Sequence, residues 1–134
     1  GCATVSSQDQ IEHVRSVARH FDPIEFHCRR TLPISDEFHG GAHVFLVPEE
    51  GHSDIEKLHD HLYGGVLAPC LRQDIPFIPH ITLGKFDDLD SAQRQCNEFN
   101  RQSLHIAGSL RTLLVGAVEA GGFKVDLAIP LGRC

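Results

Sequence analysis

Residues 79–84 read Pro-His-Ile-Thr-Leu-Gly, which places a histidine and a threonine two positions apart within an otherwise apolar run. In a β-strand, residues i and i+2 point to the same side of the sheet. We therefore predict that His80 and Thr82 project together, and that Pro79, Ile81 and Leu83 face the core. An imidazole can accept or donate a proton near neutral pH, and a hydroxyl can hydrogen-bond an anionic oxygen. This pair therefore suits the chemistry of phosphate esters.

The composition narrows the classes of function. Ten histidines among 134 residues favour acid–base chemistry or metal binding, whereas a net charge of −6 argues against a broad electrostatic contact with duplex DNA. No run approaches the roughly eighteen apolar residues of a membrane span, so a soluble protein without a membrane partner is expected. The five cysteines are widely spaced, with no CxxC pair and no recognisable signal peptide. We expect reduced thiols and a cytoplasmic location.

Three amphipathic helices are predicted to support this strand. The first opens at Ser7, where Gln10 completes a capping box, and ends before Pro23. The second opens at Ser53 and stops at the glycine pair 64–65, and the third follows an acidic stretch whose carboxylates suit a helix N-terminus. Their apolar stripes are Ile11, Val14, Val17, Ala18 and Phe21 in the first helix, Ile55, Leu58 and Leu62 in the second, and Leu89, Ala92, Cys96 and Phe99 in the third.

Strand-like segments alternate with these helices. Two of them, 112–118 and 123–129, flank the glycine pair 121–122 and are predicted to form a hairpin. The interspersed helices and strands predict an α/β or α+β sheet layered with helices. The remaining segments with strand character are 24–28, 43–47, 77–83 and 104–107.

An internal repeat indicates two similar lobes within a single domain spanning residues 1–134. The stretch CATV at 2–5 corresponds to HITL at 80–83, and each is followed by a polar loop and a capped helix. Two further pairs of segments continue the repeat: IEFHC at 24–28 with LHIAG at 104–108, and GGAHVFLVP at 40–48 with GGFKVDLAIP at 121–130. By this repeat Cys2 corresponds to His80, and Thr4 to Thr82.

The stretch IPFIPHITLGKF at 75–86 resembles the second signature of the 2H phosphoesterase superfamily, also called the 2'-5' RNA ligase-like proteins. Residues 42–62 and 121–132 resemble further parts of that family, so the similarity covers nearly the whole chain. The resemblance implies an α+β fold of two lobes with pseudo-twofold symmetry, in which antiparallel sheets line a central cleft and helices lie outside.

The same resemblance implies hydrolysis of phosphodiesters without a metal or other cofactor. The expected substrates are RNA ends, 2'-5' linkages or cyclic nucleotide phosphates, so the partner would be a nucleotide or an RNA end. The implied catalytic set is His80 and Thr82 from one lobe, facing Cys2 and Thr4 from the other.

One departure from the family pattern lies at Cys2, where the first catalytic histidine is expected. A thiol has an ordinary pKa of about 8.5 and does not transfer protons with imidazole geometry. The strand and helix that precede this motif in the family are also expected to be missing. The chain is then a fragment, or it carries a natural or engineered change at Cys2, or the first motif lies elsewhere. The alternative function is a catalytically degenerate member that binds nucleotide or RNA.

Metal binding is the competing class of function. The pairs His39 with His43 and His59 with His61 have suggestive spacings. A helical ligand pair needs a spacing of four, however, and the first pair spans a Gly-Gly turn. We therefore interpret these residues as surface histidines.

Charged and aromatic residues outside the motif have two open interpretations. The arginine pair at 29–30 and Arg111 either approach a phosphate or form solvated strand ends. Lys85, just past the motif, either adds positive potential near the cleft or has no role there, the second being the expectation. Phe77 and Phe86 flank the motif and either stack on a base or pack in the core, the second being the expectation for Phe77.

Overall fold

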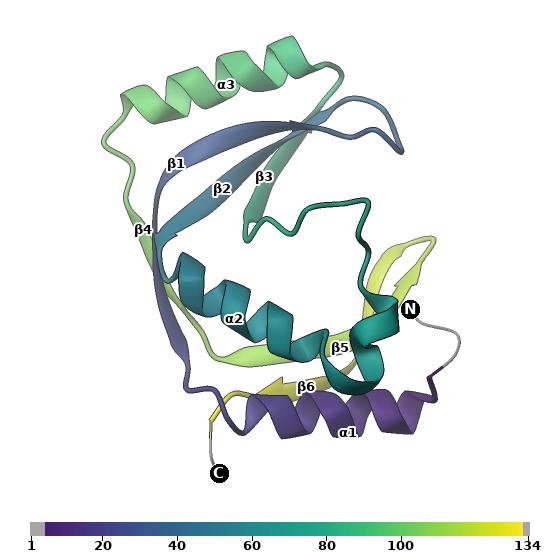
Figure 1. Ribbon diagram of the computed structural model, residues 1–134. Coiled ribbons are helices and arrows are strands. Elements are labelled where there is room, and N and C mark those ends of the chain that lie inside the picture. Colours follow the sequence, from purple (N-terminus) through teal and green to yellow (C-terminus); the bar gives the residue numbers. More distant parts are fainter. Residues whose placement is uncertain (1–4, 133–134) are drawn as a thin grey trace. The chain divides into compact units, whose positions relative to one another are not determined.

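The computed structural model describes residues 5–132, which fold into a mixed α+β structure with antiparallel strand pairs, as predicted. The chain divides into two compact units (Figure 1). The first contains residues up to 24 together with 54–76 and the segment from 109 onward, and the second contains 25–53 and 77–108. The elements are α1 (Ser7–Ala18), β1 (Ile24–Ser35), β2 (Ala42–Glu50), α2 (His52–Leu62), the 3-10 helix η1 (Gly65–Cys70), β3 (Ile81–Phe86), α3 (Leu89–Arg101), β4 (Ile106–Leu110), β5 (Thr112–Glu119) and β6 (Gly122–Pro130).

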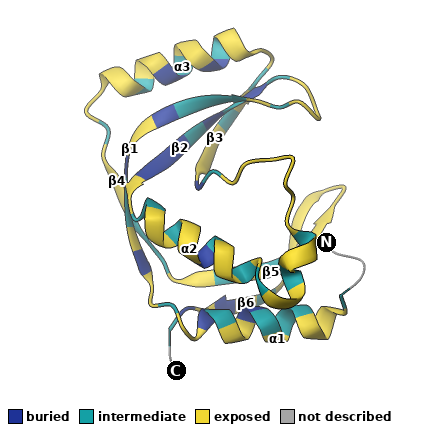
Figure 2. Ribbon diagram, in the orientation of Figure 1, coloured by how far each residue is buried: buried dark blue, intermediate teal, exposed yellow. Residues whose placement is uncertain are grey.

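The second unit contains a four-stranded sheet in the order β3-β2-β1-β4, covered on one face by α3 (Figure 1). Ala42 and Val44 of β2 are fully buried against Ala92 and Cys96 of α3, which lie one helical turn apart on the buried side of that helix (Figure 2). Because strand residues alternate between faces, His43 and Phe45 of β2 point to the opposite face of the sheet.

The first unit contains the β5–β6 hairpin, predicted around the glycine pair 121–122, and α1 packs against β6. Leu113 and Ile129 are cross-strand partners on the face turned towards the helices. The core contains the buried residues Val14, Ala18, Ile24, Leu58, Ile129 and Leu131. Thus the apolar stripes predicted for the first two helices supply this core.

The helix caps refine the predicted helix starts. The side chain of Ser6, not Ser7, caps α1, because its Oγ accepts the backbone N–H of Asp9 at 3.2 Å. Asp88 caps α3 in the same way and accepts the N–H of Ser91 at 2.7 Å, which holds the pKa of Asp88 below its usual range. The acidic stretch was therefore a correct signal for the start of α3.

The core prediction for the motif strand is wrong at two positions. Pro79 is buried as predicted, but Ile81 and Leu83 are 45% and 43% exposed. The reason is that β3 is the edge strand of its sheet, and the buried residues beneath α3 come from β2. The strand also begins at Ile81, so His80 immediately precedes it rather than lying within it.

Five cysteines were predicted to be reduced thiols. Among the described residues, two of them are free and a third forms a disulfide bond. Cys28 and Cys96 are buried free cysteines, and burial raises the pKa of Cys28. Cys70 is disulfide-bonded, so the expectation of a reduced thiol is wrong at this position. Within residues 5–132, no helix is long and apolar enough to cross a membrane.

Candidate active site

The face of the second unit's sheet that points away from α3 presents the two motif residues. Phe45 of β2 is the direct cross-strand partner of Thr82 on β3, so both side chains lie on the same face. His80 shares that face, since its ring stacks on the ring of Phe45. The prediction that His80 and Thr82 project together therefore agrees with the strand register.

The imidazole of His80 is held in one orientation by two contacts. Its Nδ1 lies 2.6 Å from the carbonyl oxygen of Ile78, and because a carbonyl only accepts hydrogen bonds, Nδ1 must carry the proton. Its ring lies nearly parallel to the ring of Phe45, with centroids 3.5 Å apart and planes inclined by 9°. In the neutral ring, the lone pair is then on Nε2, which has no hydrogen-bond partner in the described part of the chain.

Thr82 adds a hydroxyl beside this ring. Its side chain is exposed, and it makes no hydrogen bond to any residue between 5 and 132. A free hydroxyl next to an imidazole with an available nitrogen can bind an oxygen of a phosphate while the imidazole transfers a proton. The site is therefore equipped for acid–base chemistry on an oxyanion.

A second histidine lies on the other side of Phe45. The ring of His43 stacks on Phe45 with centroids 6.0 Å apart, and its Nε2 donates to the carboxylate of Asp36 at 3.1 Å. The backbone N–H groups of His39 and Phe38 also donate to that carboxylate. The backbone hydrogen bond from His39, followed by the side chain of His43, holds the pKa of Asp36 well below its usual range. Asp36 is thus a fixed negative charge that orients His43.

The other half of the predicted site, Cys2 and Thr4, lies outside the described residues. Its placement opposite His80 and Thr82 stays a prediction.

The four histidines with suggestive spacings all contact polar groups within the chain. His39 and His43 contact different oxygens of Asp36, whereas His59 lies beside Asp60, and His61 donates to the carbonyl of Lys57. Among the described residues, no group of three or more His, Cys, Asp or Glu side chains is arranged to hold a metal ion. His39 and His61 are exposed, as the interpretation as surface histidines expects, whereas His43 and His59 are partly buried.

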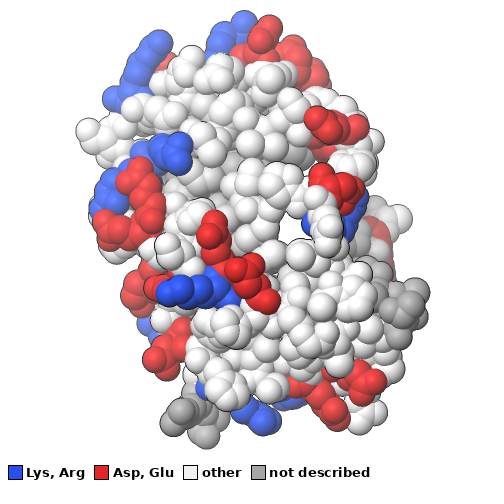
Figure 3. Space-filling model, viewed as in Figure 1, with Lys and Arg blue, Asp and Glu red and all other residues white. Residues whose placement is uncertain are grey.

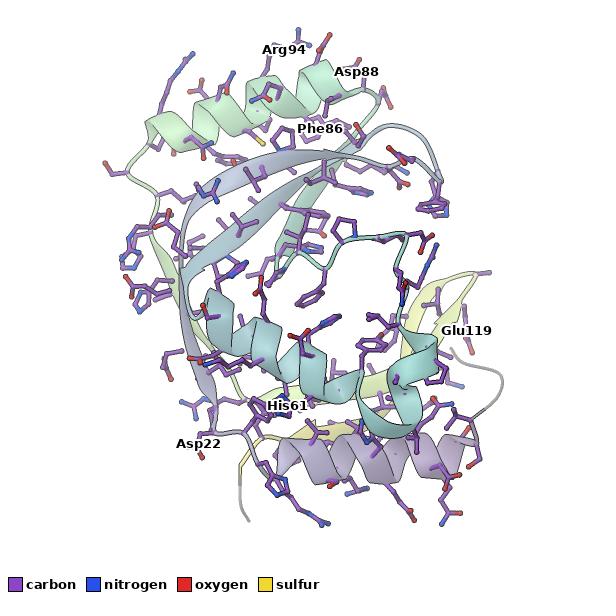
Figure 4. All side chains as sticks on the ribbon, in the orientation of Figure 1. Asp22, His61, Phe86, Asp88, Arg94 and Glu119 are labelled. Carbon is purple, nitrogen blue, oxygen red and sulfur yellow. The ribbon has the colours of Figure 1, made fainter. Side chains whose placement is uncertain are left out.

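The flanking aromatic residues differ in their surroundings. Phe77 is 43% exposed, so its expected place in the core is wrong. Phe86 packs against the cluster formed by Ala42 and Val44, and its ring lies between α3 and the sheet (Figure 4). Of this pair, therefore, Phe86 is the one that packs in a core.

The arginine pair at the start of the second unit is engaged by carboxylates. Arg29 approaches Glu50 at 3.0 Å, and Arg30 lies 3.9 Å from Glu49. Basic and acidic side chains are also interspersed on the face shown in Figure 3, where neither sign forms a continuous patch. These arginines therefore fit solvated, ion-paired side chains better than a phosphate-binding pair. They lie in the middle of β1, so the expectation of a strand end is wrong at this pair.

Sequence reasoning missed three residues of this site, namely Asp36, His43 as an oriented ring, and Phe45. The signal was present in the alternation of residues 42–46, where three apolar residues at every second position are separated by His43 and Phe45. Reading the two faces of that strand separately would have placed His43 and Phe45 opposite the buried residues.

Comparison with known proteins identifies relatives of the chain. Residues 3–115 match the family model described as the 2'-5' RNA ligase superfamily. A protein of Geobacillus sp. (strain WCH70), named as a "putative phosphoesterase", is 25% identical over 118 residues. The alignment covers 86% of this chain and 64% of that relative, so the chain spans less than two thirds of the relative's length. The α+β structure with its antiparallel sheet and helices is consistent with the fold predicted from the motif.

Proposed function

Because the chain belongs to the 2'-5' RNA ligase superfamily, we propose that it is a metal-independent phosphodiesterase acting on RNA ends, 2'-5' linkages or cyclic nucleotide phosphates. Superfamily membership and the name of the Geobacillus relative both suggest phosphoesterase activity. The observation that carries the proposal is the state of His80. Its Nδ1–H is committed to the Ile78 carbonyl, so that Nε2 is available for proton transfer beside the hydroxyl of Thr82.

In this mechanism Nε2 of His80 accepts a proton from the attacking hydroxyl or water, or donates one to the leaving oxygen. The hydroxyl of Thr82 donates to a non-bridging phosphate oxygen, where negative charge accumulates in the transition state. A second proton-transfer group is required on the opposite side of the phosphate. Cys2 and Thr4 are the residues proposed for that side, with Thr4 as the second phosphate ligand.

The test is hydrolysis of 2',3'-cyclic nucleotides and 2'-5' oligonucleotides in the presence of EDTA. We expect turnover by the unsubstituted protein and a loss on the order of 10²–10⁴-fold in His80→Ala, the range typical of general acid–base catalysis. His20→Ala is a matched control, because His20 is also exposed and its Nδ1 also donates to a backbone carbonyl. Equal losses in both variants, or activity that requires added zinc, would contradict the proposal.

A second candidate function is the binding of nucleotide or RNA without efficient turnover. It is favoured by the cysteine at position 2, since a thiol replaces the imidazole that the family's first motif supplies. Tight binding without hydrolysis, persisting in Cys2→His, supports this candidate. Hydrolysis that increases in Cys2→His supports catalysis and assigns the proton transfer to position 2.

The cytoplasmic location and the absence of duplex DNA and membrane partners stay predictions. The location was inferred from five reduced thiols, and the disulfide at Cys70 weakens that inference. The treatment of residues 1–134 as one domain with two lobes also stays a prediction.

A further inference from the structure

Two histidines of the second unit are in contact where β4 begins. His27 lies on β1, and His105 immediately precedes β4, the strand that pairs with β1 at the edge of the sheet. Nδ1 of His27 lies 2.8 Å from Nε2 of His105. Two ring nitrogens form a hydrogen bond only if one of them carries a proton and the other a lone pair. At least one of these two rings is therefore neutral while the contact exists.

The arrangement of the two rings favours this hydrogen bond over the chelation of a metal ion. The ring centroids are 5.1 Å apart, and the ring planes are inclined by 20°. The centroid separation is close to the N···N distance of 2.8 Å plus the radius of each ring, so both nitrogens lie nearly on the line between the centroids. Each nitrogen therefore points at the other, whereas two ligands of one metal ion point towards a common third position.

Charged side chains of β1 and β2 lie around His27. Its register partner on β2 is Glu50, whose carboxylate lies 3.5 Å from Nε2 of His27. Arg29 of β1 approaches the carboxylates of Glu50 at 3.0 Å and Glu49 at 3.7 Å. Glu25 lies two residues before His27, on the same side of β1. The residues of β4, IAGSL, add no charged side chain.

The two histidines therefore differ in how they accommodate a positive charge. A proton added to His27 is balanced by Glu50, and the hydrogen bond survives because Nε2 of His105 still offers a lone pair. His105 is exposed and makes no ion pair with any residue between 5 and 132. A second proton, on His105, leaves two N–H groups facing each other and places two positive charges side by side.

We propose that His27 and His105 form a pH-sensitive clasp, which fastens the start of β4 to β1 while one ring is neutral and releases it when both are charged. Histidine is the side chain whose charge changes between about pH 5 and 8, so the clasp is closed near neutral pH and opens in acid. The middle of β4 is held differently, because a Cβ added at Gly108 would lie 2.5 Å from the ring of Phe26. Opening is thus confined to residues 102–106, between α3 and the middle of β4.

A titration of the intact chain followed by NMR tests the sharing of the proton. We expect the ring resonances of His27 and His105 to move in two separate steps as the pH falls, because the second proton must break the hydrogen bond. In His105→Ala the ring of His27 should titrate in a single step. Backbone amide resonances of residues 102–106 should move with the second step, whereas those of 108–110 should not.

Urea unfolding of His105→Ala tests the effect of the clasp on stability. Near neutral pH we expect its midpoint to be lower than that of the unsubstituted protein by roughly 0.5 M, because one hydrogen bond is lost. At about pH 5 the order should reverse, because the variant lacks one of the two repelling charges. His20→Ala is the matched control, since Nδ1 of His20 donates to the carbonyl of Ser16, and a charged ring keeps that bond. No reversal is expected for it.

Two outcomes would overturn the clasp. One is a single titration step for each ring that is unchanged by removal of the other ring. The other is a deficit in the urea midpoint of His105→Ala that is the same at neutral pH and at about pH 5, or a reversal that His20→Ala also shows. Neither measurement depends on turnover, so the clasp and the proposed hydrolysis stand or fall separately.

Discussion

The ring of Phe45 lies flat against the imidazole of His80, with centroids 3.5 Å apart and the planes inclined by 9°. This contact joins two adjacent strands of the sheet, because Phe45 comes from β2 and His80 immediately precedes β3. One face of the imidazole is therefore covered, and the ring cannot turn without losing both the stack and the hydrogen bond to Ile78. We regard Phe45 as a positioning residue for His80.

Substitution of Phe45 tests this positioning role. We expect Phe45→Leu to lower kcat on the order of tenfold, because the imidazole is then free to adopt other rotamers and tautomers. Phe45→Tyr keeps the ring stack and should retain activity. Long-range proton–nitrogen NMR measures the tautomer directly, and a His80 ring that stays protonated at Nδ1 alone in Phe45→Leu would contradict the role.

Removal of the hydroxyl of Thr82 should lower the rate of catalysis without lowering the stability of the fold. Thr82→Val preserves the β-branched shape, and the hydroxyl has no partner in the described chain, so the free energy of unfolding should change little. We expect kcat to fall on the order of 10²-fold, the effect typical of losing one donor to a developing oxyanion. Thr82→Ser should recover most of the activity, whereas equal kcat in Thr82→Val and the unsubstituted protein would sink the assignment of Thr82 as a phosphate ligand.

The carboxylate of Asp36 should make stability depend on pH. Backbone and side-chain donors hold its pKa well below its usual range, so the folded state binds its proton less readily than the unfolded state. The resulting stabilisation is fully present above the ordinary pKa of about 3.9 and declines as the pH falls below it. We expect Asp36→Asn to unfold at lower denaturant concentration than the unsubstituted protein near neutral pH, with the gap narrowing in acid.

Denaturant unfolding at a series of pH values checks this expectation. Asp22→Asn, which removes an exposed carboxylate just beyond the end of α1, serves as the charge control. A gap for Asp36→Asn that stays constant from neutral pH down to about pH 3, below the ordinary carboxyl pKa, would contradict the linkage.

The contact between α3 and β1 depends on Asn100. Its Oδ1 accepts the backbone N–H of Thr31 at 2.8 Å and the hydroxyl of Thr31 at 3.2 Å, and its Nδ2 donates to the carbonyl of Thr31. Thr31 is only 1% exposed, so Asn100→Ala removes the side-chain partner of its backbone N–H and carbonyl, whereas its hydroxyl keeps the carbonyl of Cys96 at 3.5 Å. We expect a loss of about 1–3 kcal/mol in the free energy of unfolding. Asn97→Ala, at an exposed position of the same helix, should cost much less.

Local sequence signals were sufficient for the helices and the β5–β6 hairpin. Asp88 and the apolar positions Ala92 and Cys96 mark the start and the buried side of α3, and both observations depend only on residues within one or two turns. The glycine pair 121–122 likewise marks the β5–β6 turn. Such signals are local because capping bonds and side-chain periodicity are set by neighbouring residues.

The pairing of strands could not be predicted from the sequence alone. The predicted strand 24–28 continues to Ser35, because residues 31–35 pair with 42–46 of β2. The exposure of Ile81 and Leu83 follows from the edge position of β3, which depends on the order of strands in the sheet. Neither fact is encoded in the spacing of the residues within β3.

The sequence by itself determined that His80 and Thr82 share one side of an extended segment, since alternation along a strand is a property of the backbone. Only the tertiary structure decided what lies beside them. The ring of Phe45 and the oriented His43 come from β2, a strand far earlier in the chain, and a β-bulge at Leu83 turns Lys85 to their side. These relationships depend on the register between two strands, which is fixed by packing across the whole sheet rather than by either strand alone.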